Sequence, residues 1–225
     1  DDNLTTLKAN ILRATLSKVF SDTRKGNLSI VSSDFEKMYK NYYASGYTAG
    51  ATVVTMDGYL DPTERENTII SGNIVNEVGN HTLLVGVELI DTTNENFRYN
   101  TFWSTTSDDN EVFNITRPMD FSVNSAGVAT SNDYTADLKS KTKSDIDVTS
   151  FFIQDQIDVS DKLKLMIGGR HDSFDITVTD VKAGSAAARK DTKFSPRAGV
   201  IFKPQDNISW YYSYSESFLP RSGEQ

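Results

Sequence analysis

The residue types that perform catalysis are sparse in this sequence. It contains no cysteine and only two histidines, His81 and His171, so thiol nucleophiles, disulfides and cysteine-based metal sites are excluded. Neither histidine belongs to a serine or cysteine nucleophile motif, and both stand at or near the ends of predicted strands. Histidines in such places are usually surface or interface residues. We therefore expect no catalytic residues and expect that the protein is not an enzyme.

Two short motifs resemble phosphate or cation sites. Gly168-Gly169-Arg170 lacks the Gly-Lys-Ser/Thr ending of a phosphate-binding loop. It also lies inside a predicted strand, where glycines favour close packing or twist. The acidic run Asp108-Asp109-Asn110-Glu111 carries oxygen atoms suited to calcium, but no full ligand spacing follows it. We interpret this run as a solvated loop, and we expect no metal site and no covalently bound cofactor.

A third group, Arg98, Tyr99, Phe102 and Trp103, stands at the start of the longest predicted connector, residues 98–144. Long connectors without periodicity are usually functional or disordered. Aromatic rings stack on flat ligand groups and an arginine donates charge-assisted hydrogen bonds, so these four residues are candidate ligand contacts. The alternative is an aromatic girdle at a membrane surface, with Arg98 contacting a phosphate there.

Strands must position these residues, because alternation with a period of two dominates the sequence. In residues 82–90 every odd position is apolar, and similar alternation recurs in 162–174, 194–203 and 208–217. Residues 4–20 fit a helix or a strand, and we interpret them as a strand. We expect eight antiparallel strands, at roughly 4–20, 27–43, 65–78, 81–97, 145–158, 163–179, 191–203 and 208–219.

The predicted connectors are of two kinds that alternate along the chain. Tight polar ones lie near 21–26, 78–80, 160–162 and 204–207, and long ones near 44–64, 98–144 and 180–190. Long strands, short turns at one end and long loops at the other are typical of transmembrane β-barrels. Aromatic residues near strand ends suit a membrane interface. A soluble β-sandwich remains the alternative architecture.

Composition narrows the partners. No stretch of 18 apolar residues occurs, so a transmembrane helix is not expected. The formal charge of −8 argues against nucleic acid. A transmembrane strand needs only about 9–11 residues, of which half can be polar.

Odd and even positions of a strand point to opposite faces of a sheet, so the sequence predicts one apolar face and one polar face. The predicted polar face carries Glu88, Arg170, Asp172 and Arg197, which would point into a barrel lumen, where charges meet water. On the lipid face, an arginine at the midplane would cost about 2–4 kcal/mol. Asp155 breaks the pattern because it shares the parity of apolar neighbours. A bulge or a position near the membrane interface would relieve this conflict.

Three segments carry a family resemblance. Residues 150–172 (SFFIQDQIDVSDKLKLMIGGRHD) and 194–218 (FSPRAGVIFKPQDNISWYYSYSESF) resemble the mid-barrel strand–turn–strand pattern of TonB-dependent ferric-siderophore receptors. Residues 81–88 (HTLLVGVE), preceded by Arg65-Glu66-Asn67, resemble an earlier hairpin of the same family. Residues 1–60 resemble it more loosely.

The resemblance implies a 22-stranded barrel of the bacterial outer membrane, closed by a plug domain and energised by a TonB-type periplasmic coupling protein. Residues 1–225 contain about eight strands and no recognisable plug sequence, so we expect an all-β, antiparallel up-and-down transmembrane barrel domain, here part of a larger barrel. The implied ligand is a ferric siderophore, and the implied surroundings are outer-membrane lipid and lipopolysaccharide, whose phosphate Arg98 would contact in the girdle alternative. Two alternatives are a small structural outer-membrane barrel and a soluble β-sandwich adhesin.

Overall fold

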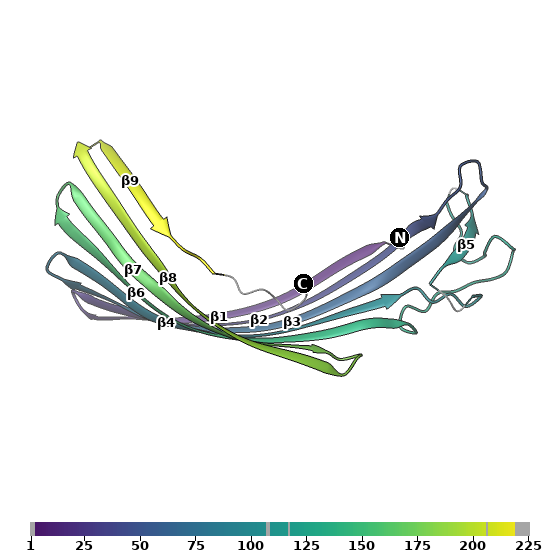
Figure 1. The fold of residues 1–225 in the computed structure, drawn as a ribbon, viewed down its shortest axis with the longest axis horizontal. Helices are drawn as coiled ribbons and strands as arrows, with labels where there is room; N and C mark the ends of the chain where they lie inside the picture. The colour runs from purple at the N-terminus through teal and green to yellow at the C-terminus, as the bar shows by residue number, and fades with distance from the viewer. Residues whose placement is uncertain (1–2, 107–108, 117, 206, 219–225) are drawn as a thin grey trace.

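The computed structural model describes residues 3–106, 109–116, 118–205 and 207–218. They form one antiparallel sheet in the order β1-β2-β3-β4-β6-β7-β8-β9, with β5 paired to β3 (Figure 1). Except for β5 and β9, the strands are 18 to 26 residues long. The strands are β1 (Leu4–Ser21), β2 (Arg24–Gly46), β3 (Val53–Val78), β4 (His81–Asn100), β5 (Glu111–Asn114), β6 (Leu138–Ser160), β7 (Leu163–Asp180), β8 (Ser185–Gln205) and β9 (Ile208–Ser215).

All eight predicted strands are present, and residues 4–20 form a strand rather than a helix. Three strands begin earlier than predicted: β3 at Val53, β6 at Leu138 and β8 at Ser185. The connector predicted at 180–190 is therefore only residues 181–184. Residues 138–144 are almost entirely polar and residues 185–190 are small or charged, so alternation does not mark them. Residues 53–64 do alternate from Val54 to Asp61, and the prediction missed this signal. The strand β5 was missed because four residues are too few to show alternation, and β9 ends at Ser215; residue 219, its predicted end, lies outside the described residues.

The tight turns join the strands as predicted. Ile157 pairs with Leu165 across the turn at 161–162, and Gly79, with φ of 62°, makes the turn between β3 and β4. A positive φ strains any residue with a Cβ, so glycine suits this position. The turn between β8 and β9 contains Asp206, which lies outside the described residues, and Gln205 pairs with Ile208 across it.

Hydrogen-bonded register confirms that the sheet has two different faces. Residues paired across neighbouring strands share a face, and the next row along points the other way. One row is apolar except for its histidine: Leu16, Leu28, Gly72, Val87, Phe151, His171 and Phe194. The adjacent row is polar throughout: Thr15, Ser29, Ser71, Glu88, Ser150, Asp172 and Lys193. We call these two sides the apolar face and the polar face.

The apolar face is exposed over a continuous band near the tight turns. Leu28, Val85, Phe151 and Phe194 are each about half exposed. Trp210 and Phe202 end the band with an edge-to-face ring contact at 6.2 Å. Such an exposed apolar band is unstable in water and matches a lipid bilayer.

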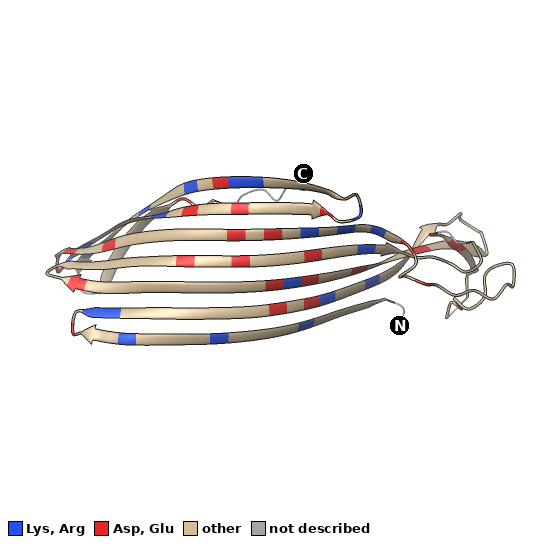
Figure 2. Ribbon diagram, turned by 90° about the horizontal axis from the view of Figure 1, so that it is seen from below, with Lys and Arg blue, Asp and Glu red and all other residues tan. Residues whose placement is uncertain are grey.

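Charged residues concentrate on the strand halves that lead to the β2–β3 and β4–β6 loops, while the halves nearer the tight turns are mostly uncharged (Figure 2). On the apolar face, the band gives way to a row containing Asp91, Asp147 and Asp175. The band therefore ends well before the strands do, and the long strands continue beyond the membrane-spanning segment.

The described strands form one curved layer, and no second sheet packs against it (Figure 1). This excludes the β-sandwich for the described part of the chain. Glu216–Phe218 leave β9 over the concave side and lie beside Arg170 and Arg197, so the polar face is the concave one. In the ranges given above, no helix is long and apolar enough to cross a membrane.

Candidate functional site

The polar face carries a cluster of tyrosines around one ion pair at its loop end. Asp61 stands opposite Arg98, because the neighbouring pairs are Leu60 with Tyr99 and Thr63 with Asn96. The Arg98 guanidinium donates two hydrogen bonds to the Asp61 carboxylate, from Nε at 2.5 Å and from Nη2 at 2.6 Å. This bidentate geometry fixes the guanidinium plane.

Three tyrosines surround that pair. The Arg98 guanidinium lies 4.2 Å from the centre of the Tyr59 ring. Tyr59 contacts Tyr39 edge-on at 5.7 Å and Tyr43 at 6.1 Å. Together with Asp61 these residues form what we call the vestibule cluster: Tyr39, Tyr43, Tyr59, Asp61 and Arg98. A groove of about 380 Å³, lined in part by Asp61, Asn96, Arg98 and Ser140, adjoins it.

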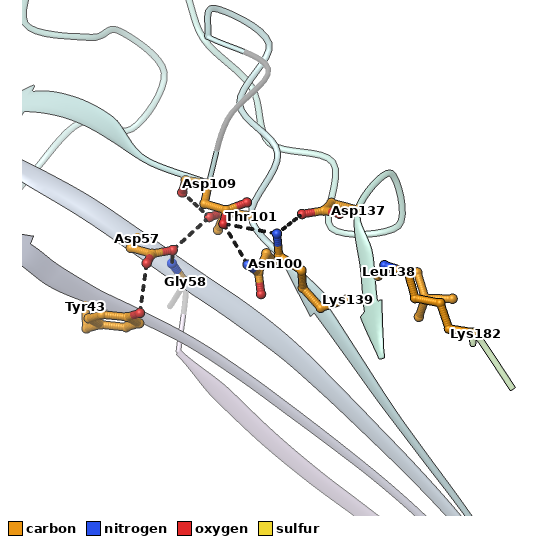
Figure 3. A network of polar contacts seen from close by, with 10 residues as sticks. All are labelled: Tyr43, Asp57, Gly58, Asn100, Thr101, Asp109, Asp137, Leu138, Lys139 and Lys182. Atoms are coloured by element: carbon orange, nitrogen blue, oxygen red, sulfur yellow. Dashed lines mark hydrogen bonds and ion pairs between the residues drawn. The ribbon is translucent and has the colours of Figure 1, made fainter. Parts of the chain in front are cut away.

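Asp57 connects the vestibule cluster to the base of the loop between β4 and β6 (Figure 3). Its carboxylate accepts hydrogen bonds from the Tyr43 hydroxyl at 2.8 Å, from the backbone N–H of Gly58 at 2.6 Å and from the Thr101 hydroxyl at 3.3 Å. Tyr43 lies beyond the apolar band, and its hydrogen bond to Asp57 raises the pKa of its hydroxyl.

The network continues into the loop. The Thr101 hydroxyl, fully buried, also donates to the backbone carbonyl of Asp109. The Asp109 carboxylate accepts from the Asn100 side chain at 2.8 Å and pairs with Lys139 at 3.5 Å. Lys139 also pairs with Asp137 at 3.3 Å, which joins the two ends of the loop (Figure 3).

A small hydrophobic core holds the loop against β2 and β3. Val54, Met56, Trp103 and Phe113 are buried, and Trp103 meets Phe113 edge-on at 5.0 Å. Partly buried residues complete this core: Tyr42, Met119 and Phe121. The loop is therefore a packed unit.

The structure places the four predicted ligand contacts in different surroundings. Trp103 is only 1% exposed and supports the loop from within, so it is available neither to a ligand nor to a membrane girdle. Tyr99 points to the face opposite Arg98 and stacks on Phe97 at 6.3 Å, because successive strand residues alternate. Phe102 is half-buried, and its backbone N–H donates to Asn132. Of the four residues, Arg98 alone joins the vestibule cluster.

Sequence reasoning missed Tyr39 and Tyr59 as ligand candidates. Tyr59 fell in a predicted long connector, and β3 in fact extends through it to Val53. The sequence did carry a signal for Tyr59. It lies two residues from Asp61, so in a strand both side chains point to the same face.

The four residues predicted to face a lumen lie together on the polar face. Arg170 donates to Glu88 and, through Nε, to Asp172, each at 2.7 Å. Ser150, fully buried, donates to Asp172 at 2.5 Å and accepts from Arg170. Arg197 lines the same pocket of about 470 Å³, and its buried Nε has no hydrogen-bond partner in the described part of the chain.

Other sequence candidates have structural partners. Asp155 lies on the apolar face close to the tight turns, where His81 Nδ1 approaches its carboxylate at 2.7 Å. The register is regular at Asp155, so its position near the strand end and its pairing with His81 relieve the conflict, not a bulge. His171 belongs to the exposed apolar row.

The structure describes part of the acidic run at residues 108–111. Asp108 lies outside the described residues, while Glu111 is buried and accepts hydrogen bonds from Thr105 and from the backbone N–H of Val112. Over the described ranges, no three His, Cys, Asp or Glu side chains gather as a metal site would require.

A single antiparallel sheet with one apolar exposed face and one polar face is the wall of a transmembrane β-barrel. Residues 4–225 match the family model described as TonB dependent receptor-like, beta-barrel. The chain belongs to this family, whose members are outer-membrane proteins of bacteria.

Two curated relatives support this assignment. The ferrichrome outer membrane transporter/phage receptor of Escherichia coli (strain K12) is 31% identical over 162 residues, which cover 71% of this chain and 20% of the relative. The ferrioxamine B receptor of Salmonella typhimurium (strain SL1344) is 25% identical over 183 residues, covering 81% and 22%. The chain thus spans about a fifth of the length of these relatives.

Solved structures share the fold. The pyoverdine outer membrane receptor of Pseudomonas aeruginosa PAO1 superposes with a TM-score of 0.78 at 16% identity, over 98% of this chain and 30% of that one. The ferric-catecholate import receptor of E. coli K12, in its open form, gives 0.71 at 14% identity, over 98% and 37%.

Proposed function

We propose that residues 1–225 form part of the barrel domain of an outer-membrane receptor that binds and imports ferric siderophores. The relatives named for ferrichrome and ferrioxamine B support the ligand class. The observation that carries the proposal is the vestibule cluster, in which Arg98 is held by Asp61 against the face of Tyr59. Rings and a fixed guanidinium on a concave wall suit a compact chelate.

The proposed role of the chain is binding and passage rather than catalysis. The apolar band would contact lipid, and the charged rows beyond it would meet lipopolysaccharide. The polar face, with Glu88, Arg170, Asp172 and Arg197, would line the lumen and face a plug domain elsewhere in the receptor. A TonB-type coupling protein would act through that plug to energise import. The siderophore is the transported ligand, and no cofactor or nucleic acid takes part.

The test uses the receptor that contains this chain, purified in detergent. Replacing Tyr59 and Arg98 together with alanine should weaken the binding of ferrichrome at least about tenfold, because the stacking ring is lost together with the guanidinium that lies over it. Binding is measured by quenching of intrinsic fluorescence, and assembly by the heat-dependent gel mobility of folded barrels.

Tyr99→Ala is the matched control, because it removes a ring from the neighbouring position on the opposite face. Unchanged ferrichrome affinity in the correctly assembled double variant would reject the vestibule cluster as the site. Absence of binding by the unmodified receptor to every ferric chelate tried would reject the siderophore function and favour a structural barrel.

A further inference from the structure

The charged side chains that adjoin the vestibule cluster on the polar face of β2, β3 and β4 balance one another. On the polar face, Lys37 and Arg98 carry two positive charges, and Asp57 and Asp61 carry two negative ones. Lys37 is exposed and its Nζ lies 5.8 Å from the centre of the Tyr39 ring. These strands therefore present tyrosine rings without a surplus of positive charge, and the loop residues beyond Asp57, namely Asp109, Asp137 and Lys139, add one further negative charge.

The arginine is already engaged. Its Nε and one terminal nitrogen donate to the two oxygens of Asp61, and its plane lies over Tyr59. An anionic ligand approaching Arg98 must compete with a bidentate carboxylate and meets the negative charge of Asp61 at close range. Like charges brought together oppose association.

Asp57 adds a second obstacle to an anion. Its three hydrogen-bond donors, from Tyr43, Gly58 and Thr101, are all neutral groups. They satisfy the carboxylate oxygens with neutral groups, which leave the negative charge of Asp57 in place. A catecholate or carboxylate oxygen of a ligand beside Tyr43 would face this charge.

We propose that the vestibule cluster selects ferric chelates without net charge and discriminates against anionic ones, an inference that rests on the proposed siderophore function. In a ferric trihydroxamate, three singly charged groups balance Fe³⁺, and the complex is neutral. In a ferric tris-catecholate, three doubly charged groups leave a charge of −3. The flat hydroxamate groups stack on the tyrosine rings.

The experiment measures affinities of the full receptor for two probes, ferrichrome as the neutral trihydroxamate and ferric enterobactin as the trianionic tris-catecholate. Ferrichrome should bind at least about tenfold more tightly at low salt, and the ratio should shrink as salt rises, because screening weakens like-charge repulsion. Asp61→Asn should reduce the ratio of ferrichrome affinity to ferric enterobactin affinity at least about threefold, because it frees Arg98 to bind the anion. Glu95→Gln removes an equal charge at the same end of β4 but on the opposite face. It should leave the ratio of the two affinities unchanged.

Equal or tighter binding of ferric enterobactin would overturn this inference while leaving the siderophore function intact. A preference for ferrichrome that is insensitive to salt would overturn it as well, and this measurement needs no variant. Binding of neither probe would count against the proposed function itself.

Discussion

Arg98 and Tyr99 are consecutive residues of β4, yet their side chains lie on opposite faces of the sheet. Arg98 pairs with Asp61 on the polar face, and Tyr99 stacks on Phe97 on the other. Sequence proximity had suggested that both contact one ligand. Strand geometry separates them, because successive side chains point to opposite sides.

The two faces predict opposite tolerance to charge at consecutive positions. Val85 lies in the exposed apolar band and its neighbour Leu84 on the polar face. Val85→Arg should destabilise the assembled barrel by about 2–4 kcal/mol, the cost of a guanidinium near the bilayer midplane. Urea unfolding from lipid vesicles measures this difference.

Leu84→Arg is the control for that experiment, since its guanidinium would reach the hydrated concave side. It should assemble nearly as well as the unmodified protein. Equal destabilisation by the two variants would contradict the assignment of faces.

The buried ring of Trp103 predicts that the loop depends on it. Trp103→Ala should destabilise the packed loop by about 3–5 kcal/mol, because a large buried ring leaves a cavity. Faster protease cleavage within 101–137, with unchanged barrel mobility on gels, would report this local effect. Val123→Ala, at a loop position 39% exposed, should have little effect; comparable cleavage rates in both variants would count against the loop core.

Gly58 is predicted to be sterically required. A Cβ there would lie 2.7 Å from the backbone oxygen of Asn41 and 2.9 Å from Tyr42. Gly58→Ala should therefore cost about 1–3 kcal/mol through overpacking, and it should loosen the nearby contacts of Asp57. Thermal unfolding measures the loss.

Gly72→Ala provides the comparison within the same strand. Its added Cβ would meet nothing closer than 3.8 Å, which is ordinary contact. A melting temperature lowered equally by both substitutions would show that the loss is a general effect of β3 and not of the close approach at Gly58.

The hydrogen-bond network of Arg170 is predicted to contribute more to the free energy of unfolding than an exposed ion pair does. Arg170→Met would leave Glu88 and Asp172 without their shared donor, and Asp172 is only 7% exposed. We expect a loss of about 1–3 kcal/mol, the cost of an unsatisfied buried group. Lys8→Met breaks an exposed pair with Glu36 and should change stability by less than about 1 kcal/mol. Chemical unfolding measures the free energy of unfolding of both variants, and an equal loss in the two would contradict the prediction.

Within each strand, the sequence alone determined a great deal. A period of two separates residues into two sets whatever the neighbouring strand does, so Glu88, Arg170, Asp172 and Arg197 were assigned to the polar face correctly. Short polar segments between alternating runs predicted the tight turns and hence the antiparallel order. The family resemblance followed from the same strand–turn–strand motifs.

Only the tertiary structure decided which residues of different strands meet. The face on which a side chain lies cannot be inferred across a long connector, and a nearly all-polar segment such as residues 138–144 shows no alternation. The N-terminal part of β3 was assigned to the predicted connector at 44–64, so the alignment of Tyr59 and Asp61 with Tyr39, Tyr43 and Arg98 was not predicted. Likewise, a buried Trp103 and an exposed one look alike in sequence, because burial depends on how the loop folds back onto β2 and β3.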